Sequence, residues 1–171
     1  AAEVLIEAGE TNASELEVGA LLVLITAQQR RGQGMHAERT AEHALRLARE
    51  SGLHYGIARV LTLQGNSQLF QGRYEQARAC FYGARSVALE HGLRYDLASA
   101  LRGLRVICTY TNALSEALEI AQHELSIWRD LGLERGEAMT LEGVALIQNY
   151  LGRSADSLRM MTQAQTVSKR L

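Results

Sequence analysis

The feature that most constrains this chain is a repeat with a spacing of 40 residues. Gly52, Gly92 and Gly132 are each followed by leucine. Two further columns keep the same spacing: Ala58, Ala98 and Ala138, and Leu61, Leu101 and Leu141. A fixed period of this length is the signature of a solenoid, in which each unit packs on its neighbours. The sequence therefore predicts a stack of similar units, with the column of leucines buried between helices.

Each unit is expected to be a pair of helices. The 171 residues include no proline, and apolar residues follow a period near 3.6 between the glycines. In the second unit the pattern predicts helices over 56–71 and 74–91, with a tight turn between them and a longer turn after Gly92. We predict an all-α solenoid of antiparallel helical hairpins, one domain over 1–171. Its expected parts are a partial helix 1–9 and repeats at about 15–52, 56–92, 96–132 and 136–171.

Glycine marks the turn inside each hairpin. Three turns are expected at Gly32, Gly72 and Gly152, and Asn112 stands at the same position of the third unit. Asparagine is the usual substitute for glycine where φ is positive. At the helix starts, Ser14 with Glu17 fits a capping box, and Asp96 is a favourable N-cap. Small side chains at Ala37, Ala77, Ala117 and Ser157 predict close approach of two helices.

The second unit contains one spaced set of glycine, alanine and aromatic residues: Gly65, Gly72, Tyr74, Ala77, Phe81 and Ala84. In these residue types and spacings it resembles the tetratricopeptide repeat. Leu61 replaces the pattern's tryptophan, Gln68 replaces its tyrosine, and the final proline is absent. The longer period is similar to the extended repeats of bacterial LuxR-type regulators, signalling ATPases and diguanylate cyclases. The resemblance implies a right-handed superhelix with a concave groove, within a regulatory region of a larger bacterial signalling protein. The chain itself is expected to be a piece of such a protein.

By this resemblance, the first helices of the repeats present the groove residues. The expected partner-binding set is Arg59, Asn66, Phe70, Arg102, Tyr110, Asn149 and Tyr150, with Thr62 and Thr109 also exposed there. Aromatic rings recur at the 40-residue spacing as Phe70, Tyr110 and Tyr150, beside groups that hydrogen-bond or pair with carboxylates. The alternative is that these rings pack on the following hairpin.

No catalytic or metal-binding motif accompanies the repeats. The five histidines form no metal-ligand pattern, and Cys80 and Cys108 are expected to be packed thiols. We therefore expect no enzyme activity, no metal and no cofactor. A net charge of −1 does not favour nucleic acid, and no long apolar run suggests a membrane partner. The expected location is the cytoplasm.

The leading functional expectation is a non-catalytic module that binds a protein or peptide in its groove. The alternative is a receptor for a small ligand or a signalling peptide. A third expectation concerns the last helix, whose apolar residues are Leu158, Met161, Ala164 and Val167. Because end repeats need a cover, we expect either further repeats or end-to-end association between copies.

Overall fold

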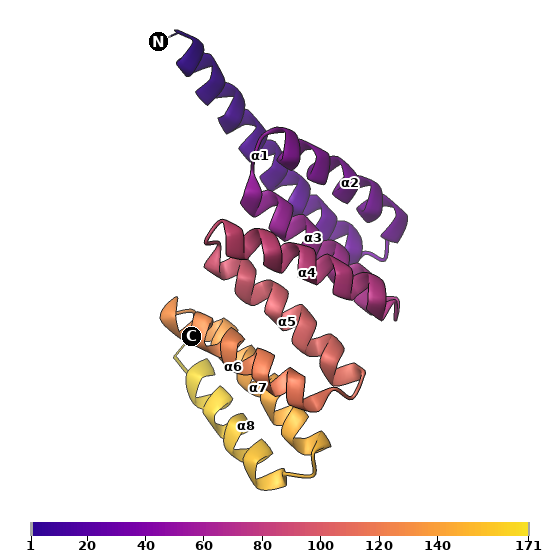
Figure 1. The fold of residues 1–171 in the computed structure, drawn as a ribbon, viewed down its shortest axis with the longest axis vertical. Helices are drawn as coiled ribbons and strands as arrows, with labels where there is room; N and C mark the ends of the chain where they lie inside the picture. Colours follow the sequence, from indigo (N-terminus) through magenta and orange to yellow (C-terminus); the bar gives the residue numbers. More distant parts are fainter. Residues whose placement is uncertain (1, 171) are drawn as a thin grey trace. The chain divides into compact units, whose positions relative to one another are not determined.

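The computed structural model describes residues 2–170, with side chains described from residue 12 onward. Within this part the chain forms α-helices joined by short turns, with no strand (Figure 1). The helices are α1 (Ala2–Arg30), α2 (Gly34–Glu50), α3 (His54–Phe70), α4 (Tyr74–Glu90), α5 (Arg94–Tyr110), α6 (Leu114–Asp130), α7 (Glu134–Tyr150) and α8 (Ser154–Ser168). The predicted all-α class is confirmed.

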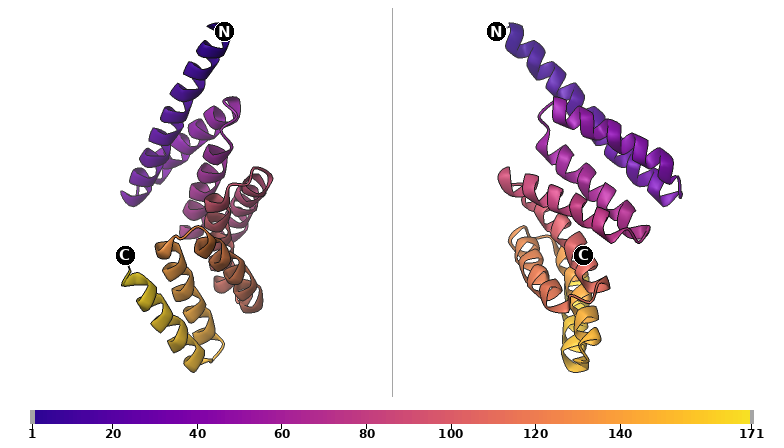
Figure 2. Two further views of the ribbon diagram at one scale, coloured as in Figure 1. Left: turned by 90° about the vertical axis from the view of Figure 1, so that its left-hand side faces the viewer. Right: turned by 45° about the vertical axis from the view of Figure 1, so that its right-hand side comes forward.

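Consecutive helices pack in two compact units, Ala1–Leu93 and Arg94–Leu171. In the first unit α1 pairs with α2 and α3 with α4, while in the second α5 pairs with α6 and α7 with α8. Figure 2 shows the antiparallel course of α7 and α8. The predicted helical hairpins are therefore confirmed within each unit, and the handedness of a continuous superhelix stays a prediction.

Each turn between these helices has the same backbone geometry. After α2, the Gly52 amide donates to the Arg49 carbonyl at 3.2 Å and the Leu53 amide donates to the Ala48 carbonyl at 2.8 Å. These two bonds define the Schellman motif, which needs a left-handed residue after the helix. Such a residue stands at positions 32, 52, 72, 92, 112, 132 and 152, six of them glycines with φ of 65 to 72°.

Asn112 fills the seventh of these positions, with φ of 62°. Its amide and that of Ala113 make the same pair of bonds, to Thr109 and Cys108. The predicted substitution of asparagine for glycine is thus confirmed. The prediction of a longer turn between hairpins is wrong. The turns after α2, α4 and α6 are three residues long, like the turns inside the hairpins. The length by which the 40-residue period exceeds the tetratricopeptide repeat therefore lies in the helices.

Two predicted helix starts are also wrong. The first helix runs from Ala2 through Gly9 and Ser14 without a break, because one glycine among good helix formers costs only about 1 kcal/mol. Ser14 therefore does not cap a helix. Asp96 lies inside the first turn of α5, which begins at Arg94, and a carboxylate there still complements the helix dipole.

Small residues form the contact surface of the second helices. In the first unit Ala37, Ala41, Ala44 and Ala48 of α2 are buried with Val18 and Ile25 of α1. In the next hairpin the Phe81 ring lies against Gly65, where an added Cβ would be 2.7 Å from the ring. Ala37, Ala77 and Ala117, three of the four small residues at the 40-residue spacing, are buried. The prediction that this column marks close approach of two helices is confirmed at these positions.

The predicted leucine column is confirmed at two of its three positions. Leu101 and Leu141 are buried in the second unit. Leu61 is only partly buried, against α4, where a Cβ added to Gly83 would be 3.4 Å from its Cδ1. The correction has a local cause, because Gly83 offers no side chain to enclose the leucine.

The left-handed residue of the third hairpin gives a first prediction. Asn112→Val should lower the free energy of unfolding by about 1–2 kcal/mol, because a β-branched residue is strained at positive φ. Asn112→Gly should leave it unchanged or raise it. Urea denaturation followed by circular dichroism measures both. Equal stability of the two variants would contradict the role of the left-handed turn.

Candidate functional site

The second unit carries a surface on which apolar and polar side chains alternate. We call it the α5–α7 face, and its residues are Arg102, Val106 and Tyr110 of α5 with Met139, Leu146, Asn149 and Tyr150 of α7. Residues spaced by three or four share one side of a helix. The two helices touch, and Arg102 Nη1 lies 3.9 Å from Met139 Sδ. This contact places the two rows on the same side of the unit.

Both tyrosines of this face are solvent-exposed. Tyr110 and Tyr150 end their helices and are 62% and 56% exposed, and Leu146 beside them is also exposed. Asn149 is exposed, whereas Arg102 is half-buried. Four of the seven predicted groove residues thus lie on the α5–α7 face, which offers apolar area next to a guanidinium and an amide.

The other three predicted residues lie on α3 in the first unit. Phe70 ends that helix and is 91% exposed. Arg59 is exposed, with its guanidinium carbon 5.3 Å from the centre of the Tyr55 ring, and Asn66 is half-buried. All three aromatic residues of the column are exposed, so their rings are not enclosed, while packing of one ring edge on the following hairpin stays the alternative.

Two threonines predicted to be exposed are buried instead. The hydroxyl of Thr62 donates to the Ala58 carbonyl at 2.9 Å, and that of Thr109 donates to the Arg105 carbonyl at 2.8 Å. A hydroxyl that bonds its own helix in this way is satisfied without water. These positions therefore tolerate burial. Thr62 of α3 and Thr109 of α5 are not among the exposed residues of the expected groove.

The centre of the second unit holds a buried ion pair that sequence reasoning did not predict. Arg105 Nε of α5 donates to Glu124 Oε2 of α6 at 2.8 Å, and both side chains are buried. The other oxygen, Glu124 Oε1, accepts from the Thr140 hydroxyl at 2.8 Å and lies 3.4 Å from Trp128 Nε1. The carboxylate thus links three helices, because Thr140 belongs to α7.

Two glycines of α7 make room for this network. A Cβ added to Gly136 would overlap the Trp128 ring, and one added to Gly143 would overlap the Arg105 guanidinium. Tyr95 meets Trp128 edge-on, with ring centres 5.3 Å apart. A buried charge is costly unless its partners hydrogen-bond it. The network is therefore a structural centre that holds α5, α6 and α7 in register beneath the α5–α7 face.

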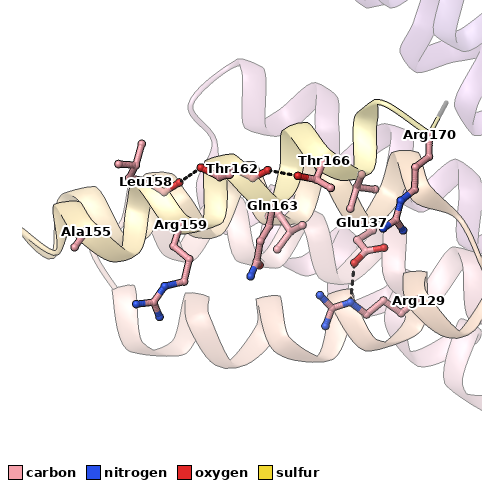
Figure 3. Close-up of a pocket in the computed structure, with 11 residues that line it drawn as sticks. Arg129, Glu137, Ala155, Leu158, Arg159, Thr162, Gln163, Thr166 and Arg170 are labelled. Atoms are coloured by element: carbon pink, nitrogen blue, oxygen red, sulfur yellow. Dashed lines mark hydrogen bonds and ion pairs between the residues drawn. The ribbon is translucent and has the colours of Figure 1, made fainter.

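A cavity of about 580 Å³ lies at the last hairpin. Figure 3 shows Arg159 and Gln163 projecting from the same side of α8, and Arg129 farther along the cavity, with its Nε 2.7 Å from Glu137 Oε1. The full lining comprises Arg129, Glu137, Leu141, Ala155, Leu158, Arg159, Thr162, Gln163, Thr166, Val167 and Arg170. Two of the three lining arginines are paired with carboxylates: Arg129 with Glu137, and Arg159 with Asp156, whose Oδ1 lies 3.6 Å from Arg159 Nη1.

A second cavity, of about 340 Å³, lies in the first unit between α2 and α3. Its lining is mostly glutamines, alanines and glutamates, with Cys80 at one side. Burial raises the pKa of the Cys80 thiol, which keeps it protonated and weakly nucleophilic at neutral pH. None of the seven predicted groove residues lines either cavity.

The described residues hold neither a cluster of metal-ligand side chains nor a membrane-spanning helix. No group of three or more His, Cys, Asp or Glu side chains there is placed to hold a metal ion. None of the helices in that part has the length and apolar character of a membrane span.

The comparisons with known proteins show the fold alone. One similar solved structure is "Crystal structure of BtubC (BKLC) from P. vanneervenii", with a TM-score of 0.77 and 16% sequence identity over 92% of this chain. This chain spans 65% of the length of that one. No protein-family model matches the sequence, and no curated protein matches it. Membership of the tetratricopeptide family therefore stays a prediction, while a helical repeat fold is established.

The buried pair gives a second prediction. Glu124→Ala should lower the free energy of unfolding by about 3–5 kcal/mol, because it leaves the Arg105 charge buried without a partner. The double variant Arg105→Met with Glu124→Leu should recover much of that loss. Thermal and urea denaturation measure these effects.

The matched control is an exposed pair in the same unit. Arg94 Nη2 lies 2.6 Å from Asp130 Oδ2, with both side chains at least half exposed. Asp130→Ala should therefore change the free energy of unfolding by less than about 1 kcal/mol. Similar losses from Glu124→Ala and Asp130→Ala would refute the structural role of the buried network.

Proposed function

We propose that this chain is a non-catalytic interaction module whose α5–α7 face binds a segment of a partner protein. The observation that carries the proposal is the exposure of Tyr110, Leu146 and Tyr150 beside Arg102 on two neighbouring helices. Aromatic and arginine side chains dominate the energetics of protein interfaces. Such a surface suits a peptide that has apolar side chains and a carboxylate.

The broader setting of the proposal comes from the sequence resemblance. Extended repeats similar to these occur in regulatory or sensor regions of bacterial signalling proteins, such as diguanylate cyclases and LuxR-type regulators. We assign this chain the same role, in the cytoplasm, as a tetratricopeptide-like region of a larger protein. Phe70, Arg59 and Asn66 on α3 stay predicted partner-binding residues of the first unit.

The proposal predicts a specific loss of peptide binding. Peptides selected from a random phage-displayed library on the wild-type chain should lose about tenfold or more in affinity for the variant Arg102→Ala, Tyr110→Ala and Tyr150→Ala. The far-ultraviolet circular dichroism of the variant should stay unchanged, because the tyrosines are exposed. Isothermal titration calorimetry gives the affinities, which should also fall as salt is raised.

A matched control removes similar groups elsewhere. Arg153 is exposed before α8, and Tyr82 is an exposed tyrosine of α4. The variant Arg153→Ala with Tyr82→Ala should bind the selected peptides like the wild type. If the control loses affinity and the triple variant keeps it, the binding surface lies outside the α5–α7 face.

A second candidate function is favoured by the cavity at the last hairpin. Its volume of about 580 Å³ falls in the range typical of small-ligand sites. Arg159 and Arg129 supply donors for a carboxylate or phosphate group. Under this alternative the chain is a receptor for a small anion.

The alternative predicts a thermal shift. Citrate, succinate or phosphate should raise the melting temperature of the wild-type chain, because a ligand that binds only the folded state stabilises it. Arg159→Ala should abolish that shift, and Arg153→Ala, which removes an arginine outside the cavity, should retain it. An equal shift in both variants would assign the effect to general ion screening.

A further inference from the structure

The cavity of about 340 Å³ in the first unit has a polar lining where the second unit has apolar contacts. Residues of α2 and α3 correspond to the residues two repeats later, in α6 and α7. Three polar lining residues correspond in this way to apolar ones: Glu38 to Leu118, Gln64 to Val144, and Ser67 to Ile147. In the second unit Leu118 packs against the cluster that contains Ile147. The first unit thus has polar groups around a cavity at a junction that the second unit packs through apolar side chains.

The lining of this cavity carries negative charge. Its carboxylates belong to Glu38 and Glu42, and its other residues are alanines, glutamines, a serine and a cysteine. The Cys80 thiol is neutral, because burial raises its pKa. Within the described part of the chain neither glutamate forms an ion pair. The two are four residues apart on α2, where like charges repel, so a cation in the cavity would relieve their repulsion.

An amide of the lining leaves a further oxygen acceptor for such a cation. Gln29 Nε2 donates to the Leu63 carbonyl at 3.0 Å, which holds the Gln29 side chain in place and leaves its Oε1 as an acceptor. Gln68 differs, because its Oε1 accepts from Arg73 Nη1 at 3.4 Å. Arg73 itself is not a lining residue. The acceptors that a cation would meet therefore include the Gln29 amide oxygen and the two carboxylates.

The cavity also has an apolar wall. Ala37 and Ala41 of α2 line it, and both are buried. The volume is at the lower end of the range of small-ligand sites. An ammonium group has three donors and no acceptor, which matches carboxylate and amide oxygens. A short alkyl chain that ends in an ammonium group therefore fits both parts of the lining.

We propose that this cavity binds a primary alkylammonium group, which donates to the carboxylates of Glu38 and Glu42 while its alkyl chain lies against Ala37 and Ala41. Hydrogen bonds between charged partners of this kind are stronger than neutral ones. A free diamine and the lysine side chain of a partner share this chemistry. None of the lining residues belongs to the α5–α7 face, so the proposal is independent of peptide binding there.

The first test uses the diamine putrescine as the probe. Isothermal titration calorimetry at fixed ionic strength should show saturable binding to the wild-type chain. Glu38→Gln with Glu42→Gln should weaken it about tenfold or more, because the change removes both charges and keeps the shape of the side chains. Circular dichroism should be unchanged, since both residues are exposed. A wild-type chain that does not bind putrescine at millimolar concentration would overturn the proposal.

The matched control removes the same charge elsewhere. Glu116 and Glu119 are exposed glutamates of α6, and Glu116→Gln with Glu119→Gln should bind putrescine like the wild type. Equal losses in the two double variants would assign binding to the net charge of the chain, which contradicts the proposal. Butanol, which has the alkyl chain without the charge, should not bind.

Two further ligands identify the source of the cation. Nα-acetyl-lysine methylamide should also bind the wild type and lose affinity in Glu38→Gln with Glu42→Gln. Tighter binding of this compound than of putrescine assigns the site to a partner's lysine, and the reverse order assigns it to a free diamine. If calcium or magnesium ions bind more tightly and displace putrescine, the cavity is a metal site and the proposal is wrong.

A last variant gives the first unit the residues of the second. Glu38→Leu with Ser67→Ile should abolish putrescine binding, because the new side chains fill the cavity and one carboxylate is lost. The melting temperature should rise, since apolar side chains replace an empty volume. Putrescine affinity equal to that of the wild type would place the binding site outside this cavity and overturn the proposal.

Discussion

A left-handed residue at every twentieth position is the constraint on which the rest of the structure depends. Each of the helices α1 to α7 ends at such a residue with the same two hydrogen bonds, and the next helix begins two residues after it. Helices α2 to α7 consequently all have 17 residues. Because helix length and turn geometry are constant, residues 40 apart occupy equivalent positions in the structure. Residues of one column in the sequence therefore lie on the same side of equivalent helices. Proline is not needed for this, because the left-handed glycine or asparagine ends each of the helices α1 to α7.

The two units fill the space between the helices of a hairpin with a large side chain from different helices. In the first unit the Phe81 ring of α4 fills the space above Gly65 of α3. In the second unit the corresponding residues are Ala121 and Arg105, so the large group now comes from the first helix. Its charge then requires a partner, and Glu124 supplies one. Exchanges that conserve volume are tolerated in cores, but this one adds a buried ion pair.

The sequence predicted the features that repeat and missed those that break the repeat. Gly72, Asn112 and the alanine columns follow from backbone and packing rules that hold in every unit. Glu124 stands in a column whose other members are Ala44, Ala84 and Ala164, and this was the available signal for a buried charge. The cavity at the last hairpin gave no such signal, because its lining arginines come from α6, from α8 and from the end of the chain after α8, at positions that share no column.

Residue types vary more along the exposed columns than along the buried ones. On the α5–α7 face, Arg102 corresponds to Glu142 and Val106 to Leu146, because solvent does not restrict the residue type as a helix contact does. The aromatic column at the helix ends is the exception. An exposed ring at the last residue of a helix adds little to folding, since it buries little apolar area. Its recurrence at Phe70, Tyr110 and Tyr150 is what the proposed contact with a partner would explain.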